Sequence, residues 1–192
     1  MRHLRYPLLL LFIFSLITPL THASTSYAVV VHVKSLEAND HNIQINTESP
    51  ASSQSLWQVL TDYDHHSQYV PHLRSTRIMK RDGPSIVIEQ MGAVRVLFWT
   101  YTMRAVFQVE EKAPGAIFFH VIDGDFTKLE GQWHLHPMDS GTTQVDVTFL
   151  CKPRAHVPAW AVRFVAKHYL VSMVKALVTR AEQSPLSPEK RR

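Results

Sequence analysis

The sequence predicts an α+β fold, in which a curved antiparallel sheet of about seven strands is wrapped on one long C-terminal helix. Residues 74–151 contain six segments of β-type alternation, and the turns between them are too short for the crossovers that parallel strands require. One face of these segments is apolar and the other largely polar, so we expect only one side of the sheet to be covered. The longest helical pattern, Pro158–Ala181, is the element available to cover it.

The N-terminus has the pattern of a secretory signal peptide. Residues 1–23 carry two arginines, an apolar run from Leu8 to Ile17, and the small-residue site Thr21-His22-Ala23. The apolar run is shorter than the roughly 20 residues that span a bilayer, which favours cleavage over a permanent anchor. We therefore expect an exported chain, periplasmic or secreted, with one domain over 24–183 and a disordered basic tail over 184–192.

Composition excludes some classes of function. Without Arg2 and Arg5 the chain keeps 18 basic residues against 16 acidic ones, and no dense basic patch with interleaved aromatics appears, so we expect no nucleic acid partner. Cys151 is the single cysteine, and its place in an alternating strand pattern indicates a buried, inert thiol.

The first elements of the domain are two strands and two short helices. Tyr27–Ser35 and Ile43–Thr47 are rich in β-branched residues and predict a hairpin. Capping residues at 49–53 precede apolar residues at helical spacing, which predicts a helix that ends near Asp62. A second short helix is expected over His65–Tyr69, because Pro71 disfavours helix at the residue before it.

The six later strands are bounded by glycine, proline and aspartate turns. Their predicted ranges are Arg74–Arg81, Ser85–Met91, Val94–Glu110, Ala116–Ile122, Phe126–His136 and Thr142–Cys151. In the longest of them, the odd positions from Leu97 to Val109 are apolar and are expected to face the helix.

The C-terminal helix carries more apolar surface than one sheet face needs. At about 100° per residue, one apolar face holds Val162, Ala166, Tyr169, Leu170, Met173, Ala176 and Leu177. A second sector holds Trp160, Phe164, Val171, Val174 and Val178. We expect the first to pack on the sheet and the second to border a cavity, a partner or a membrane, although both could be ordinary core.

Several motifs in order resemble the START-like superfamily, closest to its coenzyme Q-binding and polyketide cyclase/dehydrase-type families. These are Leu60-Thr61-Asp62-Tyr63, Tyr69-Val70-Pro71, Gly124-Asp125-Phe126, Gly131-x-Trp133, Gly141-Thr142 and Pro158-x-Trp160. The resemblance covers about Tyr27 to Ala181 and implies a helix-grip fold that encloses an apolar tunnel for a lipid, quinone or polycyclic ligand. Quinone-binding members act inside mitochondria or the bacterial cytoplasm, whereas this chain has an export pattern, so the ligand is left open.

No sequence motif for a phosphate loop, a nucleophile elbow or a zinc protease is present. The group Asp62, Asp64, His65 and His66 could bind a cation, but its aspartates fit capping and turn roles better. We expect no catalytic residue, no metal and no cofactor. Arg104 and His120 are the candidates for polar contact with a ligand, although the alternation of side chains puts Arg104 on the solvent-exposed face of its strand.

The candidate ligand surface consists of aromatic and soft aliphatic residues. It comprises Tyr69, Trp99, Tyr101, Phe107, Trp133, Trp160, Tyr169 and Met173. The favoured function is an exported carrier or binding protein for a hydrophobic small molecule, with transient membrane contact. The alternative is an enzyme of the cyclase or dehydrase kind, which would use Arg104 or His120 in the same cavity. A third interpretation is that the second apolar sector of the helix is a docking face for another protein.

Overall fold

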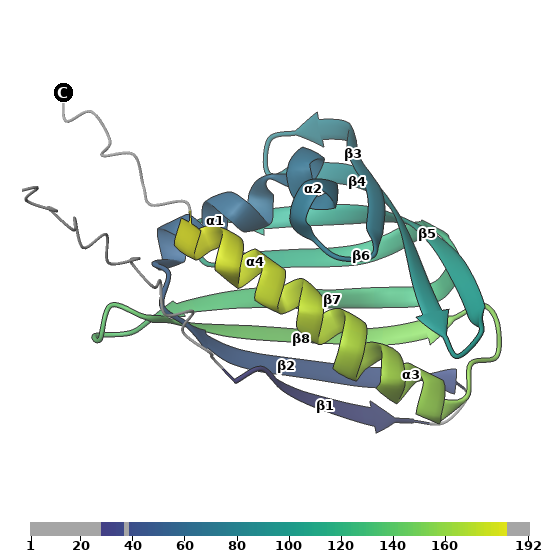
Figure 1. The fold of residues 1–192 in the computed structure, drawn as a ribbon. Helices are drawn as coiled ribbons and strands as arrows, with labels where there is room; N and C mark the ends of the chain where they lie inside the picture. The colour runs from purple at the N-terminus through teal and green to yellow at the C-terminus, as the bar shows by residue number, and fades with distance from the viewer. Residues whose placement is uncertain (1–27, 37–38, 184–192) are drawn as a thin grey trace, which may run out of the picture.

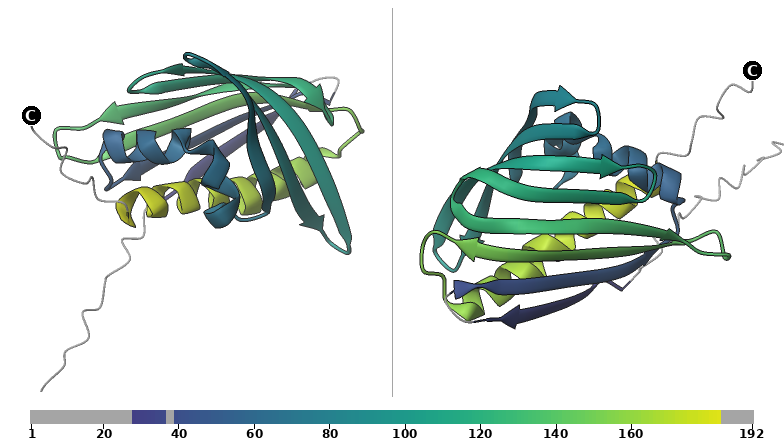
Figure 2. Two further views of the ribbon diagram at one scale, coloured as in Figure 1. Left: turned by 90° about the horizontal axis from the view of Figure 1, so that it is seen from above. Right: turned by 180° about the vertical axis from the view of Figure 1, so that it is seen from behind.

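The computed structural model describes residues 28–36 and 39–183 (Figure 1). The predicted signal peptide and the predicted basic tail lie outside the described residues, so both remain predictions. The predicted α+β class is confirmed, because a single antiparallel sheet holds one long C-terminal helix on its concave side (Figures 1 and 2).

The sheet has eight strands in the order β1-β2-β8-β7-β6-β5-β4-β3, all antiparallel. Their bounds are β1 Val30–Ser35, β2 His41–Ser49, β3 Leu73–Asp82, β4 Ser85–Val96, β5 Trp99–Lys112, β6 Ala116–Gly124, β7 Phe126–Pro137 and β8 Thr143–Pro153. The N-terminal hairpin is confirmed, and its strand β2 pairs with β8, the last strand of the chain. The sheet is therefore one strand larger than the expected seven.

The strand predicted over Val94–Glu110 is wrong at its start. The chain reverses at Leu97 and Phe98, where Leu97 has a φ of 55°, and Val96 pairs with Trp99 across the turn. The first residues of the predicted strand therefore complete β4, while β5 begins at Trp99. Because neither turn residue is glycine or asparagine, the usual sequence signal for a tight hairpin is missing at this point.

Three short helical elements lie between β2 and β3. Helix α1 (Ser53–Thr61) begins at Ser52, whose hydroxyl accepts a hydrogen bond from the Ser55 amide at 3.1 Å. A 3-10 turn, η2 (Tyr63–His65), leads into the one-turn helix α2 (His66–Tyr69). Val70 is extended before Pro71, as the proline rule predicts.

The C-terminal helix consists of α3 (Ala159–Val165), a π-helical segment η3 (Ala166–Leu170) and α4 (Val171–Gln183), which follow one another without a break. It crosses the concave face of the sheet, and α1 packs on α4 (Figure 2). Among the described residues, no helix has the length and apolar character that crossing a membrane requires.

The second apolar sector predicted for this helix does not act as one surface. Val174 and Val178 are fully buried, Phe164 and Val171 are half-buried, and Trp160 is 51% exposed. A π-helical turn contains an extra residue relative to an α-helical turn, so a strict period of 100° per residue does not hold across η3. The faces before and after this segment are consequently rotated relative to the prediction.

Gly131 in β7 lets two strands approach closely beneath the helix. It pairs with Phe149 of β8, and a Cβ at this position would overlap Phe149 Cβ and Thr148 O and lie 2.8 Å from Phe149 Cα. The space is needed because the Phe119 ring packs against both Phe107 and Phe149, at centroid distances of 5.8 and 6.4 Å. The missing side chain at Gly131 therefore leaves room for the aromatic cluster of Phe107, Phe119 and Phe149 on the concave face.

We predict that Gly131→Ala lowers the free energy of unfolding by about 1 to 3 kcal/mol, since the methyl group meets backbone rather than a movable side-chain end. Chemical denaturation measures this change. Gly115→Ala is the control, because its Cβ would lie 3.3 Å from Leu135 O and requires only a small adjustment. Equal losses in the two variants would contradict the assigned role of Gly131.

Candidate functional site

A cavity of about 310 Å³ lies between the concave face of the sheet and the C-terminal helix. Its floor comes from alternate residues of four neighbouring strands, which point to the same side because side chains alternate along a strand. These include Phe107, Phe119, Leu129, Trp133, Val147 and Phe149. The floor is therefore apolar and largely aromatic.

The roof of the cavity is the middle of the C-terminal helix. The residues that face the cavity are Val165, Tyr169, Leu170, Met173 and Leu177. Tyr169 and Leu170 belong to the π-helical segment, so the irregular turn lies directly over the cavity. Such segments are rare in helices and occur often at functional sites.

One end of the cavity reaches the surface beside Pro71 and His72, both of which are exposed and line it. The Tyr169 ring packs on the His72 ring there at 4.3 Å between centroids. The Tyr169 hydroxyl accepts a hydrogen bond from the Arg95 amide at 2.7 Å and donates one to the Arg95 carbonyl at 2.6 Å. Through these two hydrogen bonds, Tyr169 connects the C-terminal helix to β4 at the open end of the cavity.

Polar side chains on the wall include His66, Tyr63 and Gln90. His66 is 8% exposed, and its Nε2 lies 2.9 Å from the Val59 carbonyl oxygen. Because a carbonyl oxygen only accepts, Nε2 carries the proton and Nδ1 of the neutral ring is left as an acceptor. Burial lowers the pKa of His66, which keeps the imidazole neutral at physiological pH.

The Tyr63 hydroxyl is a second buried polar group at the wall. Neither this oxygen nor Oε1 of Glu111 has a hydrogen-bond partner among the described residues. Burial raises the pKa of Tyr63, and the charge of Glu111 raises it further, so the phenol stays protonated. The hydroxyl thus faces the Glu111 carboxyl, which in turn pairs with Arg81 at 3.7 Å.

Four of the predicted site residues line the cavity: Phe107, Trp133, Tyr169 and Met173. Whether they contact a ligand stays a prediction. Their place follows from regular alternation in β5 and β7 and from helical spacing around Tyr169 and Met173, which are the two signals that a sequence carries most clearly.

The other four, Tyr69, Trp99, Tyr101 and Trp160, lie outside the cavity lining. Trp99 and Tyr101 are 56% and 52% exposed because the hairpin turn places them beyond the covered part of the sheet, and Trp160 stands at the exposed start of α3. Tyr69 packs under the Arg180 guanidinium and donates its hydroxyl to the Val59 carbonyl at 3.3 Å. Burial raises the pKa of Tyr69 to about 12.

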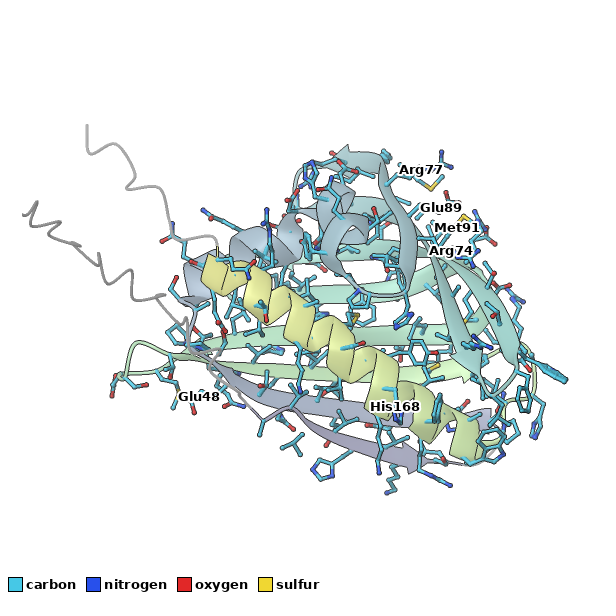
Figure 3. All side chains as sticks on the ribbon, in the orientation of Figure 1. Glu48, Arg74, Arg77, Glu89, Met91 and His168 are labelled. Atoms are coloured by element: carbon cyan, nitrogen blue, oxygen red, sulfur yellow. The ribbon has the colours of Figure 1, made fainter. Side chains whose placement is uncertain are left out.

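The two predicted polar contacts, Arg104 and His120, lie on the convex face of the sheet. Arg104 pairs with Glu89 at 2.8 Å and with Asp123 at 2.6 Å, and these contacts lower the pKa of both carboxyl groups. Glu89 also pairs with Arg77 at 2.9 Å, at the β3–β4 edge of the sheet (Figure 3). The bulge in this strand pair is at Ile122 of β6, opposite Val106 and Phe107, and it does not turn Arg104 inward.

His66 and Tyr63 line the cavity but were not predicted to do so, because His66 fits the possible cation group Asp62, Asp64, His65 and His66 in the sequence. In the structure, Asp62 pairs with His65 at 2.6 Å, and Asp64 accepts a hydrogen bond from the Ile78 amide at 3.1 Å. The i, i+3 spacing of Tyr63 and His66 was the available signal, since it puts both rings on one side of the turn.

No group of three or more potential metal ligands occurs within residues 28–36 and 39–183. Cys151 is buried in β8, and burial raises the pKa of its thiol to about 12, which confirms the inert thiol. The chemistry that the described cavity offers is thus apolar burial with a few neutral hydrogen-bonding groups.

Residues 49–178 match a family model described as polyketide cyclase/dehydrase and lipid transport. No curated protein is similar to the chain in sequence.

Solved structures share the fold at low sequence identity. A START superfamily protein from Mycobacterium smegmatis is 23% identical with a TM-score of 0.65, covering 75% of this chain and 99% of its own. An aromatase/cyclase from a Streptomyces species is 16% identical with a TM-score of 0.66, covering 78% and 98%. A STAR-related lipid transfer protein from Xanthomonas axonopodis is 17% identical with a TM-score of 0.63, covering 82% and 99%.

We predict that His66→Gln flattens the dependence of stability on pH. The pKa of His66 in the folded chain lies below its ordinary value of 6.5. Below pH 6.5 the unfolded chain therefore binds a proton at this residue that the folded chain does not bind. The free energy of unfolding consequently falls as the pH decreases. The variant removes up to about 1.4 kcal/mol per pH unit of this slope. Unfolding titrations between about pH 5 and 8 measure it.

Part of the slope remains in His66→Gln, because burial also lowers the pKa of His41. Tyr69→Phe, which removes the other side-chain hydrogen bond to the Val59 carbonyl but no group that titrates in this pH range, is the control and is expected to keep the wild-type slope. An unchanged slope in His66→Gln would show that His66 does not titrate differently in the folded chain.

Proposed function

The chain belongs to the polyketide cyclase/dehydrase and lipid transport family, and we propose that it is an exported carrier or binding protein for a hydrophobic small molecule. The observation that carries the proposal is the apolar cavity of about 310 Å³ between the sheet and the C-terminal helix. Cavities that hold small molecules usually measure about 300 to 1,000 Å³ and have apolar walls with a few placed polar groups.

The size and lining of the cavity narrow the class of ligand. The volume lies at the lower end of that range, which suits one acyl chain or a compact ring system. The flat faces of Phe107, Phe119 and Trp133 suit planar rings as well as chains. The acceptor nitrogen of His66 suits a ligand hydroxyl and the Gln90 amide suits a quinone oxygen, in each case on an otherwise apolar ligand.

Export and membrane exchange are parts of the same proposal. The signal-peptide pattern in residues 1–23 supports a periplasmic or secreted protein. A hydrophobic ligand has low solubility in water. A carrier therefore has to take it up from a membrane and release it to a membrane, which requires transient membrane contact. Intact-mass measurement of the chain from fractionated cells tests export, with a mature N-terminus at residue 24 expected outside the cytoplasm.

A cyclase or dehydrase remains the second candidate because one observation favours it. His66 is a buried neutral imidazole at the cavity wall, and Nδ1 could accept a proton from a bound substrate. The sequence-based version of this reading used Arg104 and His120, both of which lie on the convex face. Turnover of a polyketide-like substrate that His66→Gln abolishes would favour the enzyme over the carrier.

We predict that the protein, purified gently and studied by native mass spectrometry, carries a bound hydrophobic molecule that organic extraction removes. Mass and fragmentation identify its class. A protein that is free of any such molecule, and that binds none of a panel of fatty acids, quinones and polycyclic compounds, would end the carrier proposal.

We predict that Met173→Trp abolishes ligand binding and leaves the free energy of unfolding equal or higher. The indole fills cavity space that the flexible methionine leaves open, and filling a cavity removes an unfavourable void. Binding titrations and denaturation measure the two effects. Met138→Trp, at a 49% exposed site outside the cavity, is the control and is expected to bind normally.

A further inference from the structure

The β4–β5 hairpin projects beside α3 (Figures 1 and 2). The largest exposed apolar side chains of the described residues belong to these two elements. We call this group the aromatic tip. It consists of Leu97, Phe98, Trp99, Tyr101 and Trp160, which are 70%, 84%, 56%, 52% and 51% exposed. The Phe98 and Trp99 rings are 6.5 Å apart, and α3, which carries Trp160, packs against β4. Scattered exposed apolar residues need no explanation, but a cluster of this kind marks an interaction surface.

The charge around the aromatic tip is positive. The chain has no Asp or Glu from Gln90 to Val109 or from Arg154 to Ala181, the two segments that meet here. Arg95, Arg163 and Lys167 are exposed on them. Asp123 and Asp40, at the same end of the sheet, pair with Arg104 at 2.6 Å and with Lys152 at 3.0 Å, and a third carboxylate there, Asp125, accepts a hydrogen bond from the Arg104 amide at 2.7 Å.

We propose that the aromatic tip inserts into the surface of a bilayer that contains anionic lipids. Tryptophan and tyrosine prefer the boundary between headgroups and acyl chains, because their rings are apolar and their N–H and O–H groups are polar. Basic residues beside them are attracted to anionic headgroups. A narrow projecting hairpin suits a soft bilayer, whereas a protein partner or a second copy would need a broader matching face.

The position of the tip connects this surface to the cavity. Arg95 stands two residues before Leu97, and its backbone holds both hydrogen bonds to Tyr169 of the cavity roof. Tyr169 also covers His72 at the open end of the cavity. Insertion of the tip therefore brings the open end to the membrane surface. This part of the inference rests on the proposed carrier function, while bilayer binding itself does not.

The test is co-sedimentation of the purified protein with vesicles. Vesicles of phosphatidylcholine with phosphatidylglycerol are expected to bind it more tightly than vesicles of phosphatidylcholine alone, and salt is expected to weaken the difference. The double variant Phe98→Ser/Trp99→Ser is expected to bind at least about tenfold more weakly, since both exposed rings lose their apolar burial. Arg163→Glu/Lys167→Glu is expected to lose mainly the preference for phosphatidylglycerol.

The matched control is Met79→Ser/Met138→Ser, which removes two apolar side chains that are 51% and 49% exposed away from the tip and is expected to bind as wild type. Unfolding measurements check that each variant folds. No binding by the wild type, or equal binding by the tip variant and wild type, would overturn the inference. Self-association that the tip variant abolishes, without vesicle binding, would overturn it in favour of a dimer.

The two proposals fail separately in these experiments. Met173→Trp is expected to bind vesicles as wild type although it holds no ligand, so loss of the carrier function leaves the tip inference standing. The tip variant is expected to keep its ligand in native mass spectrometry. Loss of the ligand in the tip variant, with vesicle binding unchanged, would contradict the inference.

Discussion

The structure depends on the mismatch between a strongly curved eight-stranded sheet and the single helix that covers it. The concave face is apolar and has to be removed from water, and the C-terminal helix is the one long element in the described chain that does so. The helix closes the two ends of the core, where Val162 and Ala181 are buried, but it does not fill the middle. The cavity is therefore a product of the fold's geometry rather than of a separate binding motif.

Most of the fold could be predicted because regular patterns specify it. Period-two alternation identified β3 to β8 and their inward faces, helical spacing identified the C-terminal helix, and the absence of crossover connections required antiparallel pairing. The error was at Leu97 and Phe98, where two large apolar residues form the turn. Hydrophobic alternation continued through that turn, so nothing in the local sequence distinguished a reversal from an uninterrupted strand.

The candidate site could be predicted only where it follows those same patterns. Phe107 and Trp133 come from alternation, and Tyr169 and Met173 from the helix. His66 and Tyr63 could not be placed, because a short 3-10 turn sets their direction and the sequence does not specify that turn. Trp99, Tyr101 and Trp160 have the composition of core residues, and only the three-dimensional position of the hairpin distinguishes a solvent-exposed aromatic from a buried one.

The pairing of β2 with β8 has a consequence for how the chain reaches its native state. His41 stands opposite Cys151, so the N-terminal hairpin gains its neighbour only after nearly the whole domain has been synthesised. Contacts of such wide sequence separation make closure slow, because a large loop has to be ordered first. Under the proposed export, this late pairing would leave the N-terminal hairpin without its neighbour while the chain is threaded through a translocation channel.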